Sequence, residues 1–159
     1  MLLSELLTVD AIKTRVDAIA KREAVAELVS LLESAHRLDS RGEILDRVLA
    51  RETMMSTGIG NGVAIPHGKA RAVERMIAAC AVSPAGVDFD AADGEPAHLF
   101  ILLVSPESVG PSHVKVLANI SRLLKEESVR KSLREAGTAG AFLAALKAAE
   151  SRYLTPTPS

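Results

Sequence analysis

Two short apolar runs in the middle of the chain constrain its fold most. RMIAACAV (75–82) and AHLFILLV (97–104) have the length and the continuous hydrophobicity of strands buried within a sheet. The turn-rich segment SPAGVDFDAADGEP (83–96) separates them. Because helical patterns stand on both sides of this pair, the sequence predicts an α/β fold, a single-domain sandwich with a mixed β-sheet flanked by helices.

Apolar spacing places the remaining elements. The sequence predicts helices at 21–35, 42–52, 112–127, 128–137 and 140–153. It predicts shorter strands at 11–16 and 63–67, the second ending at its edge because Pro66 has no N–H to donate to a ladder. We expect one domain over residues 1–153 and a flexible C-terminal tail over 154–159.

Composition argues against several functional classes. The 159 residues are 48% hydrophobic, enough for one well-buried core. The net charge is -1 without long blocks of one sign, and aromatic residues are few, so nucleic acid is not an expected partner. Cys80 is the only cysteine, which predicts a reducing compartment, the cytoplasm. No run has the length of a membrane span and no signal peptide is recognisable, so direct membrane insertion is not expected.

The segment STGIGNGVAIPHGKA (56–70) is the strongest candidate for chemistry. It is not a nucleotide-binding P-loop, because the glycine spacing is wrong and Ala70 follows Lys69. Nor is it a dinucleotide-binding fingerprint, because Val63 stands where a third glycine is required. The four histidines of the chain lack paired spacing and a cysteine cluster, so the sequence predicts neither a metal site nor a cofactor.

What remains is a segment that presents an imidazole. Pro66 fixes the backbone that enters His67, and Gly68 leaves room beside the ring, so we expect the ring to be held but uncovered. The glycines within 58–62 allow a close bend whose amides are predicted to form an anion-binding concavity. Taken alone, Pro-His-Gly is also compatible with an ordinary turn.

The longer string STGIGNGVAIPHGK (56–69) resembles the phosphorylation-site signature of the fructose- and mannitol-type enzyme IIA domains of the bacterial phosphoenolpyruvate-dependent phosphotransferase system, including their nitrogen-regulatory members. Further similar blocks are LARE (49–52), GVDFDAADGEPAHLFILLVSP (86–106) and SHVKVLANIS (112–121). The resemblance thus covers about residues 1–150. It implies that a histidine-containing phosphocarrier protein phosphorylates His67, which in transport members passes the group to a cysteine of a IIB domain. It also implies supporting roles for a second histidine, His113, and for Arg51.

The residues themselves leave alternatives open for these two supporting positions. His113 begins an inward helical stripe that continues through Val116, Leu117, Ile120 and Leu124. In the first turn of a helix it lies where free amides favour an anion, although a structural histidine bonded to a carbonyl is the alternative. Arg51 lies off the apolar stripe of its helix and could stabilise phosphate charge through its planar fork, or be an ordinary solvated arginine.

Other polar residues are assigned to structure. His36 ends a helix and His98 opens a strand, and neither has a context that favours chemistry. Asp88 and Asp90 could be mistaken for a catalytic pair, but their turn-rich surroundings predict solvated turn residues.

Together these features predict a cytoplasmic, stand-alone enzyme IIA that acts as a phosphocarrier through phospho-His67. Transport would require a separate IIB domain, whereas regulation would require a target that distinguishes the two charge states. The lack of a second domain favours the regulatory role. A non-phosphorylated regulatory protein-binding module with the same fold is the alternative, and a metal hydrolase is weaker because ligand spacing is missing.

Overall fold

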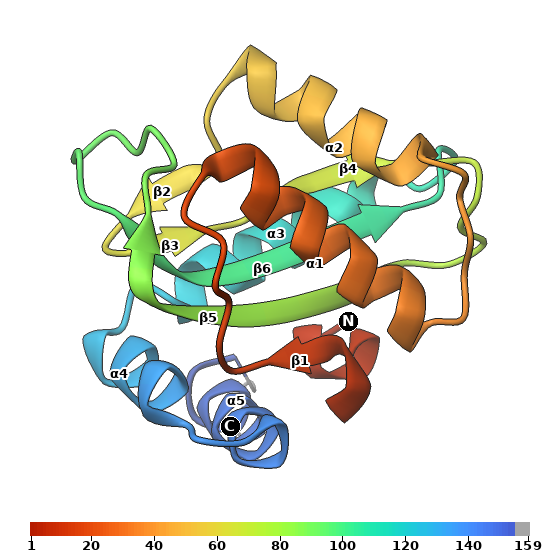
Figure 1. The fold of residues 1–159 in the computed structure, drawn as a ribbon. Coiled ribbons are helices and arrows are strands. Elements are labelled where there is room, and N and C mark those ends of the chain that lie inside the picture. The colour runs from red at the N-terminus through yellow and green to blue at the C-terminus, as the bar shows by residue number, and fades with distance from the viewer. Residues whose placement is uncertain (155–159) are drawn as a thin grey trace.

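The computed structural model describes residues 1–154, and the expected C-terminal tail lies outside the described residues from position 155 onward. The helices are η1 (Leu3–Leu6), η2 (Val9–Ala11), α1 (Lys21–Ala35), α2 (Glu43–Met54), α3 (Pro111–Leu123), α4 (Glu127–Glu135) and α5 (Ala139–Tyr153). The strands are β1 (Ile12–Lys13), β2 (Gly58–Gly60), β3 (Val63–Ala64), β4 (His67–Lys69), β5 (Ile77–Val87) and β6 (Ala97–Ser105). Figure 1 shows how helices surround one sheet.

The sheet is mixed, as the sequence predicts. Its order is β1-β5-β6-β3-β2, and β4 pairs with β6 beyond the end of β3. The two long strands β5 and β6 are antiparallel, while β1 is parallel to β5 and both β3 and β4 are parallel to β6. Strand β6 therefore pairs with β3 and β4 along one edge and with β5 along the other.

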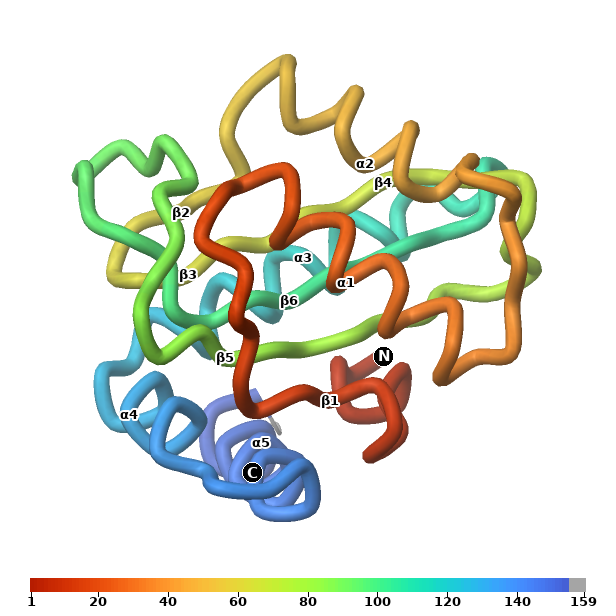
Figure 2. The backbone as a smooth tube through the Cα atoms, viewed as in Figure 1, coloured from red at the N-terminus to blue at the C-terminus, as the bar shows by residue number. Residues whose placement is uncertain are grey.

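The helices form two groups around this sheet. α1 packs against β5, and α2 lies along β4 (Figure 1). α3 lies on the far side of the sheet in this view, whereas α4 and α5 pack against each other near β1. The trace in Figure 2 places the N-terminal turns beside α5, where the amide of Ser4 donates to the Glu150 carboxylate over 3.0 Å.

One hydrophobic cluster fills the space between the layers. Its centre is the buried pair β5 and β6, whose residues 101–104 are at most 2% exposed. The rings of Phe89 and Phe100 meet edge to face with centroids 5.4 Å apart. The prediction of two buried strands at the middle of the chain is confirmed, and no helix within residues 1–154 is long and apolar enough to cross a membrane.

Three strand boundaries differ from the sequence-based expectation. β5 continues to Val87 instead of ending near Val82, because the register shifts between Val82 and Val87, a stretch in which Gly86 has a φ of +86°, and the strand pairs again with Ala97. The first strand is only Ile12–Lys13. The expected strand 63–67 is interrupted at Ile65–Pro66 and resumes as β4, so that proline breaks the ladder without ending it.

Candidate functional site

His67 opens the short strand β4 at the edge of the sheet. Residues 67–69 pair with Leu103, Val104 and Ser105 of β6, which fixes the backbone of the histidine. Pro66 contributes its carbonyl oxygen, which accepts from the Leu103 amide over 3.1 Å, although it has no amide of its own to donate. The histidine therefore sits on a paired strand and not in a mobile turn.

A hydrogen bond sets the tautomer of His67. Its Nδ1 lies 2.8 Å from the carbonyl oxygen of Ile65. Because a carbonyl oxygen only accepts, Nδ1 must carry the proton and donate it. In the neutral ring, the lone pair is then on Nε2, the nitrogen left free for nucleophilic attack.

The ring of His67 is half-buried, not uncovered as expected from the sequence. Burial is the largest influence on its pKa and lowers it below the ordinary histidine value. The positive charge of Arg51 lowers this pKa further, while the hydrogen bond to Ile65 and the charge of Glu52 raise it. The net shift is downward, so the ring is neutral near pH 7.

Gly68 explains how α2 comes so close to β4. A Cβ atom at this position would lie 3.3 Å from both the backbone nitrogen and the Cγ2 of Val48 in α2. Any side chain here would therefore push the helix outward. The glycine after the histidine serves helix packing, which brings the C-terminal part of α2 to the site (Figure 1).

His113 lies beside His67, as predicted. Their ring centroids are 5.5 Å apart and the ring planes are inclined by 57°. His113 is only 6% exposed, so its place at the head of the inward stripe of α3 is confirmed. Burial, together with the charges of His67 and Lys69, lowers its pKa to about 4, which keeps this imidazole neutral.

Ser105 holds the second histidine. Its Oγ lies 2.5 Å from Nδ1 of His113 and is buried at the carboxyl end of β6. Sequence reasoning missed this residue, and the only signal was a serine that ends an otherwise apolar strand just before the helix. The same strand thus positions both rings: β4 pairs along it, and its last side chain contacts His113.

Arg51 is half-buried in the last turn of α2, and its Nη1 donates to the carbonyl oxygen of Met55 over 2.8 Å. Within residues 1–154 it forms no hydrogen bond or ion pair with either histidine, although its charge acts on the pKa of His67. The fold therefore brings all three expected residues to one region. Donor groups of the guanidinium remain for an added anion.

The neighbouring Glu52 is a further residue that the sequence reasoning missed. Its buried carboxylate accepts from both the amide and the hydroxyl of Thr57, the amide over 2.9 Å, and lies 2.8 Å from Nζ of Lys21. These contacts fix the turn between α2 and β2. A glutamate directly after the candidate arginine was the available signal, but its partners lie on other elements.

The glycine-rich bend does not surround the histidine, contrary to the expectation of an anion-binding concavity. Gly60 and Gly62, with φ of +89° and +77°, form the turn between β2 and β3 with Asn61. The Asn61 amide donates to the Asp93 carboxylate over 2.9 Å and is not free for an anion. In the register along β6, this turn precedes His67 by about four residues or about 13 Å.

The residues assigned to structure behave accordingly. His36 Nε2 lies 3.2 Å from the carbonyl oxygen of Ala78, and His98 Nδ1 lies 2.8 Å from that of Ser83. Asp90 is exposed with φ of 55°, and its amide donates to the Asp88 carboxylate over 3.0 Å, as in a turn. No group of three or more histidine, cysteine or acidic side chains within residues 1–154 is arranged to hold a metal ion.

Comparison with known proteins decides the family. Residues 5–149 match the family described as "Phosphoenolpyruvate-dependent sugar phosphotransferase system, EIIA 2". The chain belongs to this EIIA type-2 family. The resemblance inferred from the sequence is thereby confirmed, and so is the expected fold.

Relatives of the EIIA type-2 chain carry both transport and regulatory names. It is 41% identical over 116 residues to the "PTS system fructose-specific EIIA component" of Haloferax volcanii, covering 73% of this chain and 75% of that one. It is 34% identical to the "Nitrogen regulatory protein" of Bradyrhizobium diazoefficiens, covering 92% and 95%. The 37% match to the fructose-specific EIIABC component of Bacillus subtilis covers 90% of this chain but only 22% of that longer protein.

Solved structures agree with the fold. The nitrogen regulatory protein IIA-Ntr of Neisseria meningitidis superposes with a TM-score of 0.83 at 32% identity, covering 90% of this chain and 97% of that one. The IIA mannitol protein of Escherichia coli gives a TM-score of 0.76 at 24% identity, covering 88% and 98%. The EIIA type-2 architecture thus extends across relatives of both kinds.

Proposed function

We propose that this EIIA type-2 chain is a phosphocarrier that accepts a phosphoryl group on Nε2 of His67. The observation that carries the proposal is the hydrogen bond between His67 Nδ1 and the Ile65 carbonyl, which leaves Nε2 as the free nucleophile. The lowered pKa of the ring supports the same role, because only the neutral imidazole has a lone pair to use.

In the acceptance step, Nε2 of His67 attacks the phosphorus of a phosphohistidine on a histidine-containing phosphocarrier protein. A new N–P bond forms as the N–P bond of the donor breaks, and the electron pair returns to the donor imidazole. In the onward step to a IIB domain, a cysteine thiolate attacks the phosphorus, an S–P bond forms, and His67 regains its lone pair. Positioning and charge neutralisation supply most of the catalysis in such transfers.

Two side chains are proposed to stabilise the transferred group. Arg51 carries its charge close enough to lower the pKa of His67, and its unused N–H groups suit phosphoryl oxygens. For His113, a hydrogen bond donated by Ser105 to Nδ1 would leave the proton of the neutral ring on Nε2, free to donate to the same oxygens. The pKa of His113, about 4, keeps this ring neutral, so it can act as a neutral hydrogen-bond donor.

The surface around the site suits a protein partner. Met55, whose carbonyl receives the Arg51 hydrogen bond, is 71% exposed, and Val114, directly after His113, is 66% exposed. Exposed large apolar side chains beside a reactive group favour docking of another protein over binding of a free metabolite. We place this exchange in the cytoplasm, which the single buried thiol of Cys80 supports.

The destination of the phosphoryl group is either a IIB cysteine or a regulated protein that senses the charge on His67. The regulatory destination is favoured by the likeness to IIA-Ntr of Neisseria meningitidis and by the cover of 95% of the Bradyrhizobium diazoefficiens nitrogen regulatory protein. The fructose-specific EIIA component of Haloferax volcanii supports the alternative destination, a IIB cysteine in sugar transport.

Intact-mass spectrometry tests the proposal. The protein is incubated with phosphoenolpyruvate, enzyme I and a histidine-containing phosphocarrier protein, and we expect an acid-labile adduct of one phosphoryl group. His67→Ala should give no adduct, whereas His98→Ala, a histidine bonded to a backbone carbonyl elsewhere, should give the full adduct. A folded wild-type protein that stays unmodified would instead support a non-phosphorylated binding module.

A further inference from the structure

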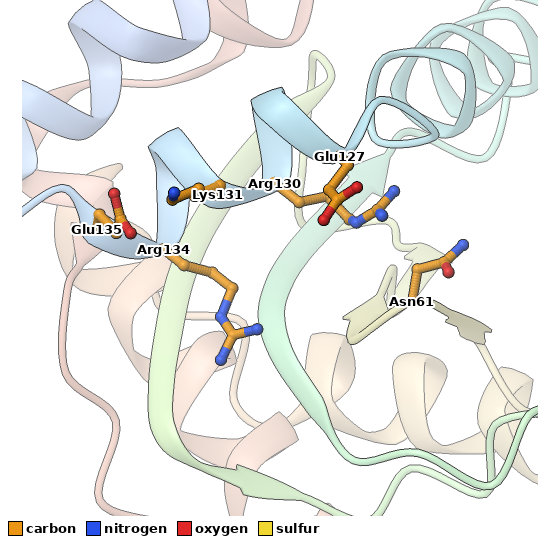
Figure 3. Close-up of a pocket in the computed structure, with 6 residues that line it drawn as sticks. All are labelled: Asn61, Glu127, Arg130, Lys131, Arg134 and Glu135. Atoms are coloured by element: carbon orange, nitrogen blue, oxygen red, sulfur yellow. The ribbon is translucent and has the colours of Figure 1, made fainter.

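A hollow that the proposed phosphoryl site does not use lies between α4 and the β2–β3 turn (Figure 3). Its volume is about 460 Å³, within the range of small-molecule sites in proteins. The lining residues are Asn61, Glu127, Arg130, Lys131, Arg134 and Glu135. None of His67, His113 and Arg51 is among them.

The charges of this α4 hollow are ordered along the helix. Glu127 is the first residue of α4 and Glu135 the last, and three cationic residues stand between them, namely Arg130, Lys131 and Arg134. Arg130 and Arg134 are one helical turn apart, about 6 Å along the axis, and therefore share a face. Three cations and two carboxylates line the hollow, so its lining has a net charge of +1.

Arg130 is held in place before any ligand arrives. Its Nη1 donates to the carbonyl oxygens of Leu124 and Lys125, both over 2.9 Å, at the end of α3. These bonds use both N–H groups of Nη1 and leave those of Nη2 and Nε. A guanidinium that is already fixed loses less conformational entropy when it binds an anion.

The other two cationic side chains of the hollow are available to a ligand. Within residues 1–154, the side chains of Arg134 and Lys131 form no hydrogen bond or ion pair. Figure 3 shows Arg130 extending from α4 toward Asn61, with Arg134 directed toward the strands. Asn61 is held by its backbone amide on Asp93, so its side-chain amide faces the hollow from a fixed turn.

A second hollow continues the positive surface beyond Asn61. It has a volume of about 400 Å³, and Asn61 lines both. Arg122 and Lys125 of this second hollow add two cations and no carboxylate. The protein as a whole has a net charge of -1, so this concentration of cations is local and not a property of the entire surface.

We propose that the α4 hollow binds a compact polyanion, a small molecule that carries phosphate or clustered carboxylate groups. Arg130 and Arg134 hold the anionic group through their N–H forks, Lys131 adds a point charge, and the Asn61 amide contacts a polar part of the same molecule. This inference goes beyond the proposed phosphocarrier function and does not depend on it.

The positions of the two carboxylates favour a small ligand over an acidic protein segment. A compact anion can contact Arg130 and Arg134 without spanning both ends of α4. An extended acidic chain laid along the helix would pass Glu127 at one end and Glu135 at the other, where like charges repel. The concave shape of the site points the same way.

Two-dimensional NMR of the full-length, unphosphorylated protein tests the site. Inorganic pyrophosphate and citrate are titrated separately at constant ionic strength, and the backbone amides and arginine Nε–H groups are followed. We expect saturable shifts at Asn61, Arg130 and Arg134 with a Kd below about 1 mM for at least one probe. The tighter probe identifies the anionic group.

Matched variants distinguish a specific anion site from general electrostatic attraction to the protein surface. Arg134→Gln should weaken binding by about tenfold or more. Arg41→Gln, which removes an exposed cation in the loop between α1 and α2, on the opposite side of the molecule from α4 (Figure 1), should leave the Kd unchanged. The inference is overturned if neither probe saturates, if the two variants bind alike, or if the shifts centre on His67 and Arg51. Dispersed spectra of each variant establish that it is folded.

Discussion

The imidazoles of His67 and His113 face each other with ring centroids 5.5 Å apart, one on a strand paired to β6 and the other on the helix that follows β6. Both rings have lowered pKa values, mainly through burial. Of two neutral imidazoles side by side, one can supply the lone pair that attacks phosphorus, and the other can donate an N–H hydrogen bond to a phosphoryl oxygen. The Ile65 carbonyl leaves the lone pair of His67 on Nε2, and a hydrogen bond donated by the Ser105 hydroxyl to Nδ1 of His113 would leave that ring's N–H on Nε2.

Ser105 should act only through His113. His113→Ala should still allow the adduct on His67, but onward transfer or adduct lifetime should change by at least about tenfold, as expected for losing one hydrogen bond of about 1.5–3 kcal/mol. Ser105→Ala should give a smaller change of the same sign, measured by a phosphotransfer time course. In a His113→Ala background, the Ser105 substitution should have no further effect on transfer. Additive effects of the two substitutions would contradict this assignment.

Arg51→Lys should slow transfer without lowering stability in proportion. Lysine keeps the charge but loses the planar fork, so phosphoryl oxygens lose bidentate contact and the rate should fall about tenfold or more. Because the replaced side chain is half-buried and its hydrogen bond is to the carbonyl oxygen of Met55, the unfolding free energy should change by about 1 kcal/mol or less. A phosphotransfer time course measures the rate, and urea denaturation measures the unfolding free energy. Equal transfer rates for the wild-type protein and Arg51→Lys would show that Arg51 is an ordinary solvated arginine without a role in transfer.

Much of this arrangement is predictable from local pattern. The apolar stripe of 21–35 coincides with α1, and the stripe that begins at His113 correctly predicts a buried ring. Such predictions succeed because helical periodicity alone decides which residues face the core.

Contacts between residues of different helices, strands or turns cannot be predicted from local pattern in the same way. Ser105 meets His113 only through the angle between β6 and α3. The turn at Asn61 and Gly62, with φ of 58° and +77°, is by contrast a local Asn-Gly hairpin turn, and only its hydrogen bond to Asp93 depends on the fold. The α4 hollow likewise depends on how a helix and a turn approach each other. Tertiary packing, not local propensity, determines these contacts.

Acceptance of the phosphoryl group should depend on pH in a direction set by the lowered pKa of His67. The reactive form is neutral, and protonation occurs below the ordinary histidine value of 6.5, so the rate should hold as the pH falls to 6.5 and decline only below it. Histidine NMR titration should find His113 protonating at a pH of about 4. Midpoints at or above 6.5 for either ring would contradict the burial argument.

Glycine substitutions at two sites should have opposite effects on stability. Gly68→Ala places a Cβ at 3.3 Å from two atoms of Val48 and should lower the unfolding free energy by about 1–3 kcal/mol. Gly140→Ala, in α5 with open space around the new atom, should raise it by about 0.5–1 kcal/mol. Thermal or urea unfolding measures both. A neutral Gly68→Ala would show that α2 is not held against β4 by this contact.

The central claim is that Nε2 of His67, and no other nitrogen, carries the phosphoryl group. Heteronuclear NMR of the phosphorylated protein, labelled with ¹⁵N at histidine, reports the residue and the ring nitrogen in one spectrum. The phosphorus coupling is predicted at Nε2 of His67, with Nδ1 still bonded to hydrogen because it donates to Ile65. Coupling at Nδ1 of His67, or at either nitrogen of His113, would contradict the account.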